Sequence, residues 1–407
     1  MAIVSISKLL LVICGLVVLL FSRHTKDISA LDAASDTGGT SRFFSELSAF
    51  STPYAVLVAI FAFAVSLLWT VAPQADALGS VAKYGKLITI LLMLGLIRSR
   101  REAQLALASF VLAQAFLLAS SWMLYFHLPV PWATSNMALQ EFAVFSSYLD
   151  QGIMSAVLAA LCWHLRSLAP SRFGKPVAVA IAVAAMANVL FVLSGRSGHV
   201  VAIALLSLAI MWELPRRLRL AAVAVPFFLV LILYLSSTKV RERLIAVKTE
   251  VASYSILAQP TTSSGVRLGF WRRAVQIIDE NPVAGAGVGA WSTEYNRLQR
   301  SQNPAHVDIA GNGNPHQEYF LWGVQLGIPG IALLCALLLA SLRDSFKMEL
   351  AHARALQSAV TALAIACAFN ASIYDALIGD FFCVLLGLLL ALGFARIASP
   401  RLNRKDA

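Results

Sequence analysis

The stretch LITILLMLGLIRSRREAQLALASFVLAQAFLLASSW, residues 87–122, decides the fold class. Two apolar runs flank a short loop that carries Arg98, Arg100 and Arg101. A backbone in lipid has no water to bond, so apolar runs of this kind cross a bilayer as α-helices. The stretch therefore predicts two transmembrane helices joined by a basic loop.

The same alternation of apolar runs and polar loops extends along all 407 residues. Hydrophobic residues make up 59% of the chain and charged residues 13%, whereas a soluble domain has roughly 25% charged residues. The predicted spans lie near residues 3–22, 54–72, 83–97, 103–122, 147–165, 175–193, 198–213, 219–236, 318–342, 355–372 and 378–397. We therefore predict an all-α polytopic transmembrane helical bundle of about 11–12 spans.

The net charge of +11 resides in short loops. The basic clusters fall in every second loop, at residues 98–101, 166–175, 216–219, 343–354 and 396–405. This positive-inside pattern sets the orientation of the spans and places the C-terminus in the cytoplasm. Membrane lipids are therefore predicted partners and nucleic acid is not. The orientation of the first span stays open, because Arg23 and Lys26 favour one direction and Lys8 the other.

One connection is far longer than the rest. About eighty residues separate the spans near 219–236 and 318–342, whereas most connections have about 4–6 residues. The predicted orientation places this loop outside the cytoplasm, and the loop contains a helix expected from about Arg267 to Glu280 and a Gly-rich turn, NPVAGAGVGAW. The chain thus divides into an N-terminal transmembrane bundle at 1–236, a partly helical outward loop domain at 237–318 and C-terminal transmembrane helices at 319–407.

The outward loops carry no nucleotide or metal motif. The sequence has no P-loop and no Asp-x-Asp pair, and GAGVGA follows a predicted helix instead of a strand, so it is not interpreted as a dinucleotide site. No cluster of His, Asp or Glu has metal-ligand spacing, so neither metal nor cofactor is predicted. The cysteines all lie in apolar spans without Cys-x-x-Cys spacing and are interpreted as core residues: Cys14, Cys162, Cys335, Cys367 and Cys383.

The segment GNGNPHQEYFLWGVQLGIPG, residues 311–330, places a histidine where a polar loop enters an apolar helix. Asn314 is predicted as the helix N-cap, Pro315 as its first residue and Gln317 as part of a capping box. His316 would then lie in the first turn, where the helix dipole favours a nearby anion and a neutral imidazole. Such a histidine suits a general base. The alternative is an interfacial histidine that only completes the cap.

Two arginines and two aspartates complete the candidate site. Arg196 lies in LSGRSGH between two apolar spans, and a charge at that depth is costly enough to indicate function. Arg267 begins the predicted helix in the long loop, and two guanidinium groups match the oxygens of a pyrophosphate without a metal. Asp375 and Asp380 follow the penultimate span and are candidates to orient a base or pair with an arginine. The alternatives are a snorkelling Arg196 and solvated loop carboxylates.

The segment HQEYFLWGVQLGIPG resembles the His-[Asn/Ser/Gln]-x9-Gly-x-x-Gly signature of bacterial O-antigen ligases. His316, Gln317, Gly327 and Gly330 stand at the matching positions. Two further segments, VLSGRSGHVV and RLGFWRRAVQIIDENPVAGAGVG, resemble the family's arginine hinge and its outward helix. The resemblance therefore extends over most of the chain.

A fourth segment, FNASIYDALIGDFF, is similar to the late Asn–Asp motif of these ligases, with Asn370 and Asp375 at the matching positions. Ile378 stands where that motif has an acidic residue, which weakens any role for Asp380.

The resemblance implies a metal-independent glycosyltransferase of the bacterial inner membrane with its site on the periplasmic face. It would transfer an O-antigen glycan from undecaprenyl pyrophosphate to a sugar hydroxyl of lipid A–core. His316 would be the base, and Arg196 and Arg267 would bind the donor pyrophosphate. Asp375, together with Gln317 and Asn314, would support the site. Gly327 and Gly330 would allow close helix packing or a helix break near Pro329.

Three alternatives stay open. An O-antigen polymerase and a protein O-oligosaccharyltransferase use the same lipid-linked donor, so the donor is the better-supported half of the prediction. The oligosaccharyltransferase is expected to have a longer C-terminal region than this chain. A transporter of lipid-linked glycans would use Arg196 and Asp375 as substrate contacts, but it would be expected to contain paired broken helices in both halves.

Overall fold

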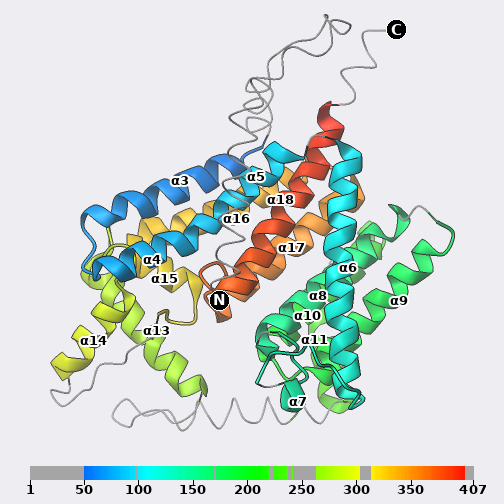
Figure 1. Ribbon diagram of the computed structural model, residues 1–407, viewed down its shortest axis with the longest axis horizontal. Helices are drawn as coiled ribbons and strands as arrows, with labels where there is room; N and C mark the ends of the chain where they lie inside the picture. The colour runs from blue at the N-terminus through cyan, green and yellow to red at the C-terminus, as the bar shows by residue number, and fades with distance from the viewer. Residues whose placement is uncertain are drawn as a thin grey trace, which may run out of the picture.

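The computed structural model describes residues 50–97, 99–136, 138–145, 147–168, 171–219, 224–236, 241, 263–302 and 313–398. Throughout these residues the secondary structure is helical, with no β-strand, which confirms the all-α prediction. The predicted span at 3–22 and Cys14 lie outside the described residues. The helices form an elongated bundle (Figure 1).

Seven helices within the described ranges are long and apolar enough to cross a membrane, so the chain is a multi-pass membrane protein. They are Gln74–Leu96, Arg100–Tyr125, Gly174–Val192, Arg196–Glu213, Ile328–Ser345, Leu350–Phe369 and Ala376–Gly393. A shorter apolar helix covers Thr52–Leu68. The predicted span at 318–342 is instead two helices, which meet at Gly327.

The helices of the N-terminal part are α3 (Thr52–Val65), α4 (Gln74–Tyr84), α5 (Ile88–Leu96), α6 (Arg100–Tyr125), α7 (Ala138–Glu141), α8 (Tyr148–Leu165), α9 (Gly174–Ala187), α10 (Arg196–Glu213) and α11 (Val225–Ser236). Those of the C-terminal part are α13 (Ser263–Glu280), α14 (Trp291–Gln302), α15 (Glu318–Leu326), α16 (Ile328–Ser345), α17 (Leu350–Phe369) and α18 (Ala376–Ala398).

The stretch at 87–122 forms α5 and α6, with Ser99 as N-cap accepting a hydrogen bond from the Glu102 amide at 3.2 Å. The first of the two spans begins earlier than predicted, at Gln74. Its first part, α4, is amphipathic: only Ala77, Ser80 and Tyr84 are buried, at helical spacing. A search for continuous apolar runs misses such a helix because its other face is polar.

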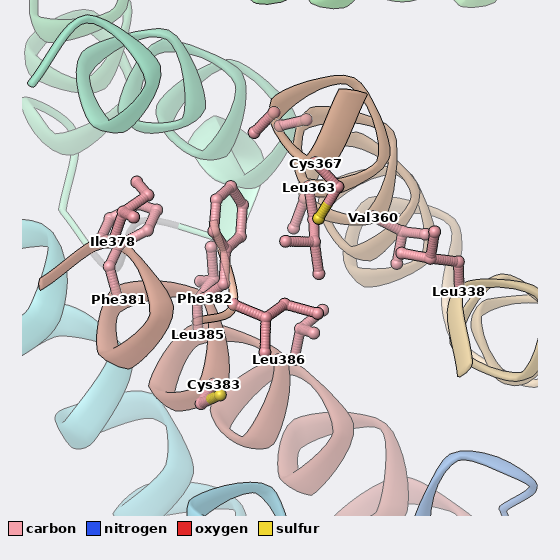
Figure 2. Close-up of a cluster of buried hydrophobic side chains, with 14 of the residues drawn as sticks. Leu338, Val360, Leu363, Cys367, Ile378, Phe381, Phe382, Cys383, Leu385 and Leu386 are labelled. Carbon is pink, nitrogen blue, oxygen red and sulfur yellow. The ribbon is translucent and has the colours of Figure 1, made fainter. Parts of the chain in front are cut away.

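The core lies along α17 and α18. Phe382 and Leu386 of α18 face Leu363 and Cys367 of α17 (Figure 2). Helix α18 also packs on α5 and α6, and α17 packs on α8 and α10, so the N-terminal and C-terminal helices share one core. The four described cysteines are free, as predicted. Cys367 and Cys383 lie in this core, Cys162 lies in a second apolar cluster between α6, α8 and α9, and Cys335 is partly buried.

A buried carboxylate joins the first described helix to α16. Asp344 is fully buried and accepts hydrogen bonds from the Ser51 amide at 2.9 Å and from the Thr52 amide and hydroxyl, both at 2.7 Å. Its negative charge is balanced by Lys347, whose Nζ lies 2.9 Å from Asp344 Oδ1. Asp344 thus supplies the acceptors that the first turn of α3 needs.

The Gly-rich turn after α13 binds backbone on two sides. The amides of Ala286 and Gly287 donate to the carbonyls of Val324 and Gln325 in α15, at 2.8 and 3.0 Å. The Val71 amide, from the connection before α4, donates to Ala286 O at 3.1 Å. Gly287 has a φ of 88°, and a Cβ there would lie 2.2 Å from the Thr70 Cα, so only glycine fits. The turn therefore holds α13 and α15 in a fixed relation at one end of the bundle, beside α4 (Figure 1).

Candidate functional site

His316 lies just before α15, in a left-handed conformation with a φ of 53°. The Asn314 side chain accepts a hydrogen bond from the His316 amide at 2.8 Å, which closes a turn. Gln317 is extended and caps the helix: its side chain accepts from the Phe320 amide at 2.6 Å. The predicted cap is therefore wrong, because the Asn314 turn directs the backbone away from a helix until Glu318.

The imidazole of His316 is held from two sides. Its ring packs against Phe270 of α13, with ring centroids 6.1 Å apart and planes inclined by 26°. Nδ1 lies 3.4 Å from Asn370 Oδ1, at the end of α17. A tautomer that donates from Nδ1 to Asn370 keeps its lone pair on Nε2, the atom that a general base uses.

The carboxylate of Asp375 completes a polar group behind His316. The Asn370 side-chain amide hydrogen-bonds to it, and Asn314 Nδ2 donates to Asp375 Oδ1 at 3.3 Å. Burial raises the pKa of Asp375, and the nearby charges of His316 and Lys86 oppose that rise. The structure thus brings His316, Asn314, Asn370 and Asp375 together, although they come from two segments of the chain.

Lys86 and Glu318 fix the loop that carries Asn370 and Asp375. Lys86 Nζ donates to the backbone carbonyl of Asp375 at 2.7 Å. Glu318 is fully buried, and its carboxylate accepts from the amides of Ile373 and Tyr374, at 2.8 and 3.1 Å. Neither residue was predicted from the sequence. Glu318 could have been identified as a candidate, because it is an acidic residue directly after His316 and Gln317 at the start of an apolar helix.

Arg196 and Arg267 lie near each other. Arg196 begins α10, and the preceding Gly195 lets that helix approach α8: a Cβ there would lie 3.1 Å from Tyr148 O. Arg267 is partly buried in α13. Burial lowers the pKa of Arg267, and the positive charge of Arg196 lowers it further. The two guanidinium groups are therefore close enough to repel each other.

Helix α13 connects the two arginines to the histidine. Arg267 and Phe270 are three residues apart, so they lie one turn apart on neighbouring positions of the helix surface. Phe270 packs on His316, whereas Arg267 interacts with Arg196. At the start of α8, Asp150 is close enough to Asp375 for an electrostatic interaction. The predicted polar site residues, apart from Asp380, thus gather where α8, α10, α13 and α15 begin, whereas Gly327 and Gly330 lie farther away.

Gly327 and Gly330 lie at the far end of α15 from His316 and allow α15 and α16 to pack closely. Gly327 has a φ of 71°, ends α15 and precedes the first turn of α16. A Cβ on Gly330 would lie 2.3 Å from Trp322 O, so the two helices pack in direct backbone contact. Asp380 lies within α18, and Ile378 is fully buried in the core, where an acidic residue would lack solvation (Figure 2). Within the described residues no three His, Cys, Asp or Glu side chains form a potential metal site.

A multi-pass helical bundle that brings together a histidine, an aspartate and two arginines defines a membrane protein with a polar candidate site. A model of the O-antigen ligase family matches residues 181–335, from α9 into α16. This part of the chain is therefore similar to the O-antigen ligase family, a family of glycosyltransferase-like enzymes. The match includes Arg196, Arg267 and His316 and ends before Asp375. A comparison with curated proteins found no match.

Proposed function

We propose that this protein is an O-antigen ligase of the bacterial inner membrane. It transfers a glycan from undecaprenyl pyrophosphate to a sugar hydroxyl of lipid A–core, at the periplasmic face and without a metal. The observation that carries the proposal is that α13 brings Arg267 beside Arg196 and Phe270 against His316. An anion-binding pair and a candidate base thus share one rigid support.

The arginine pair suits a pyrophosphate. Two guanidinium groups held close together repel each other, and an anion bound between them removes that repulsion. Each guanidinium also offers planar, paired donors that match phosphate oxygens. As the sugar leaves its carrier, negative charge grows on the pyrophosphate, so Arg196 and Arg267 stabilise the departing group more strongly than the bound substrate.

His316 acts on the acceptor. Nδ1 donates to Asn370, so Nε2 accepts the proton of the acceptor hydroxyl. The hydroxyl oxygen forms a bond to C1 of the donor sugar while the bond from C1 to the pyrophosphate oxygen breaks. Undecaprenyl pyrophosphate leaves with that electron pair, and the proton stays on His316. The Asp375 carboxylate stabilises the resulting imidazolium, because its charge interacts with that of His316.

The acceptor distinguishes the ligase from its relatives. An O-antigen polymerase or a protein O-oligosaccharyltransferase uses the same donor, and the arginine pair would serve them equally. A transporter moves the donor and forms no glycosidic bond.

The test is reconstitution of purified protein with lipid-linked O-glycan and lipid A–core, in a chelator and without nucleotide. We expect glycan on lipid A–core with the wild type, and a loss of at least about a hundredfold with His316→Ala or Arg267→Ala. Arg272→Ala is the matched control, because Arg272 lies on the same helix with an exposed side chain. Glycan that lengthens only on its own carrier would identify a polymerase. Transfer at the wild-type rate by His316→Ala would remove the histidine from the mechanism.

A further inference from the structure

A cavity of about 930 Å³ lies between α4 and α14. Its lining residues are Pro73, Ala75, Asp76, Gly79, Ser80, Lys83, Gly289, Ser292, Thr293, Asn296, Arg297, Arg300, Gly313 and Tyr374. Gly313 and Tyr374 are the chain neighbours of Asn314 and Asp375. The cavity therefore borders the polar group behind His316. None of its lining residues comes from α8, α10 or α13, the helices around the arginine pair.

The walls of the cavity suit an anionic sugar. Three cationic side chains line it against one carboxylate, Asp76. Of these cations, Arg297 is paired with Glu280 and Glu294, and the side chains of Lys83 and Arg300 are exposed. Hydroxyl and amide side chains supply further donors and acceptors from both helices. A volume of about 930 Å³ falls within the range of about 300–1,000 Å³ of small-ligand sites, which fits a short oligosaccharide segment.

Tyr374 forms the wall between the cavity and the site. Lys83 Nζ lies 4.0 Å above its ring, and its hydroxyl is 3.0 Å from Ser80 Oγ. Two residues of α4 thus fix the ring, and the Glu318 carboxylate fixes the Tyr374 backbone. Tyr374 is only 6% exposed, so its fixed ring gives this side of the cavity a defined shape.

Transfer requires the donor and the acceptor to meet at the base from different directions. The arginine pair lies on α10 and α13, whereas the cavity is lined by α4 and α14. On the basis of the proposed function, we propose that this cavity binds the anionic sugar portion of the acceptor, with Lys83 and Arg300 meeting its charge and Tyr374 shaping the adjoining wall. The charge is a phosphate or a carboxylate on the acceptor glycan.

Gly79 and Arg300 allow a sharp test. Gly79 lines the cavity and a Cβ there meets no atom within 4 Å, so Gly79→Phe adds a large side chain at the cavity wall, and Gly79→Ala is its small control. We expect Gly79→Phe and Arg300→Glu to raise the KM for lipid A–core by about tenfold or more, with donor binding unchanged. Arg272→Glu, an equal charge reversal outside the cavity, should leave this KM near that of the wild type. If the wild type is active and both cavity variants have its KM for the acceptor, the cavity proposal is wrong, whereas the proposed function still holds.

The chemistry of the acceptor separates the two sources of charge. If phosphate is the group recognised, the wild type and Arg300→Glu should have the same low transfer rate on lipid A–core whose phosphates have been removed. If the difference between them persists there but disappears after the carboxyl groups are reduced, the carboxylate is recognised instead. A difference that survives both treatments would contradict recognition of an anionic acceptor. A wild type that transfers nothing to lipid A–core would refute the proposed function before the cavity is tested.

Discussion

Replacing Glu318 tests whether the site depends on the loop behind it. The buried carboxylate accepts from the Ile373 and Tyr374 amides and from Trp322 Nε1, the last at 2.8 Å. Each buried donor left unpaired costs about 1–3 kcal/mol, so Glu318→Ala should lower the free energy of unfolding by about 3 kcal/mol or more. Glu318→Gln keeps the shape and one acceptor, so its loss should be smaller, about 1–3 kcal/mol.

The functional effect should exceed the effect on stability. The loop carries Asn370 and Asp375, which contact or interact with His316, so a displaced loop should lower kcat while the arginines of the proposed donor site keep their positions. We would measure thermal unfolding and transfer kinetics of purified Glu318→Gln at a temperature where the variant is fully folded. We expect kcat to fall at least about tenfold and the donor KM to change little.

Glu213→Gln is the matched control, because Glu213 is an exposed partner of Arg166 and such surface pairs contribute about 0–1 kcal/mol. Wild-type unfolding and wild-type kcat in Glu318→Ala would refute the reasoning, since the loop would then keep its position without the carboxylate.

Three further predictions concern single residues. Burial raises the pKa of Asp375, so its contribution to stability is present below the ordinary pKa of aspartate and is lost as pH rises through the raised value. The free energy of unfolding of Asp375→Asn should therefore rise relative to that of the wild type as pH increases, and the variant should lose transfer activity. Parallel curves of unfolding free energy against pH for the two proteins would contradict this. Asp344→Ala should lower the unfolding free energy by about 3 kcal/mol without changing KM, as denaturation and kinetics of the folded fraction would show. Gly287→Ala should lower the free energy of unfolding by about 2–4 kcal/mol, because Gly287 has a φ of 88° and contacts Thr70. Gly269→Ala is the control and should not destabilise the protein, because a Cβ there meets no atom within 4 Å. Equal melting temperatures of the two variants would contradict this.

The apolar runs predicted most of the helices because burial in lipid leaves a strong signal in composition. The α5–α6 pair and the late helices α17 and α18 lie close to their predicted ranges. The amphipathic helix α4 was not predicted, because only every third or fourth of its residues is buried.

The local structure at His316 depended on a competition that pattern alone does not decide. Asn314 was a good candidate for a helix cap, but its side chain bonds the His316 amide two residues on, and Gln317 caps the helix instead. The proximity of Arg196 to Arg267, and of Asn370 to His316, comes from packing between helices distant in sequence. The residue types pointed to the site, but only the fold places them together.

The Gly-rich turn has a consequence for engineering. It joins Val71, before α4, to Val324 and Gln325 in α15, so three separate parts of the chain depend on one another through backbone atoms. A chimera that exchanges residues 237–318 as a cassette would separate Gly287 from the surface that fits it. Designers who wish to graft a different loop should keep residues 281–290 with the host bundle and cut before the turn.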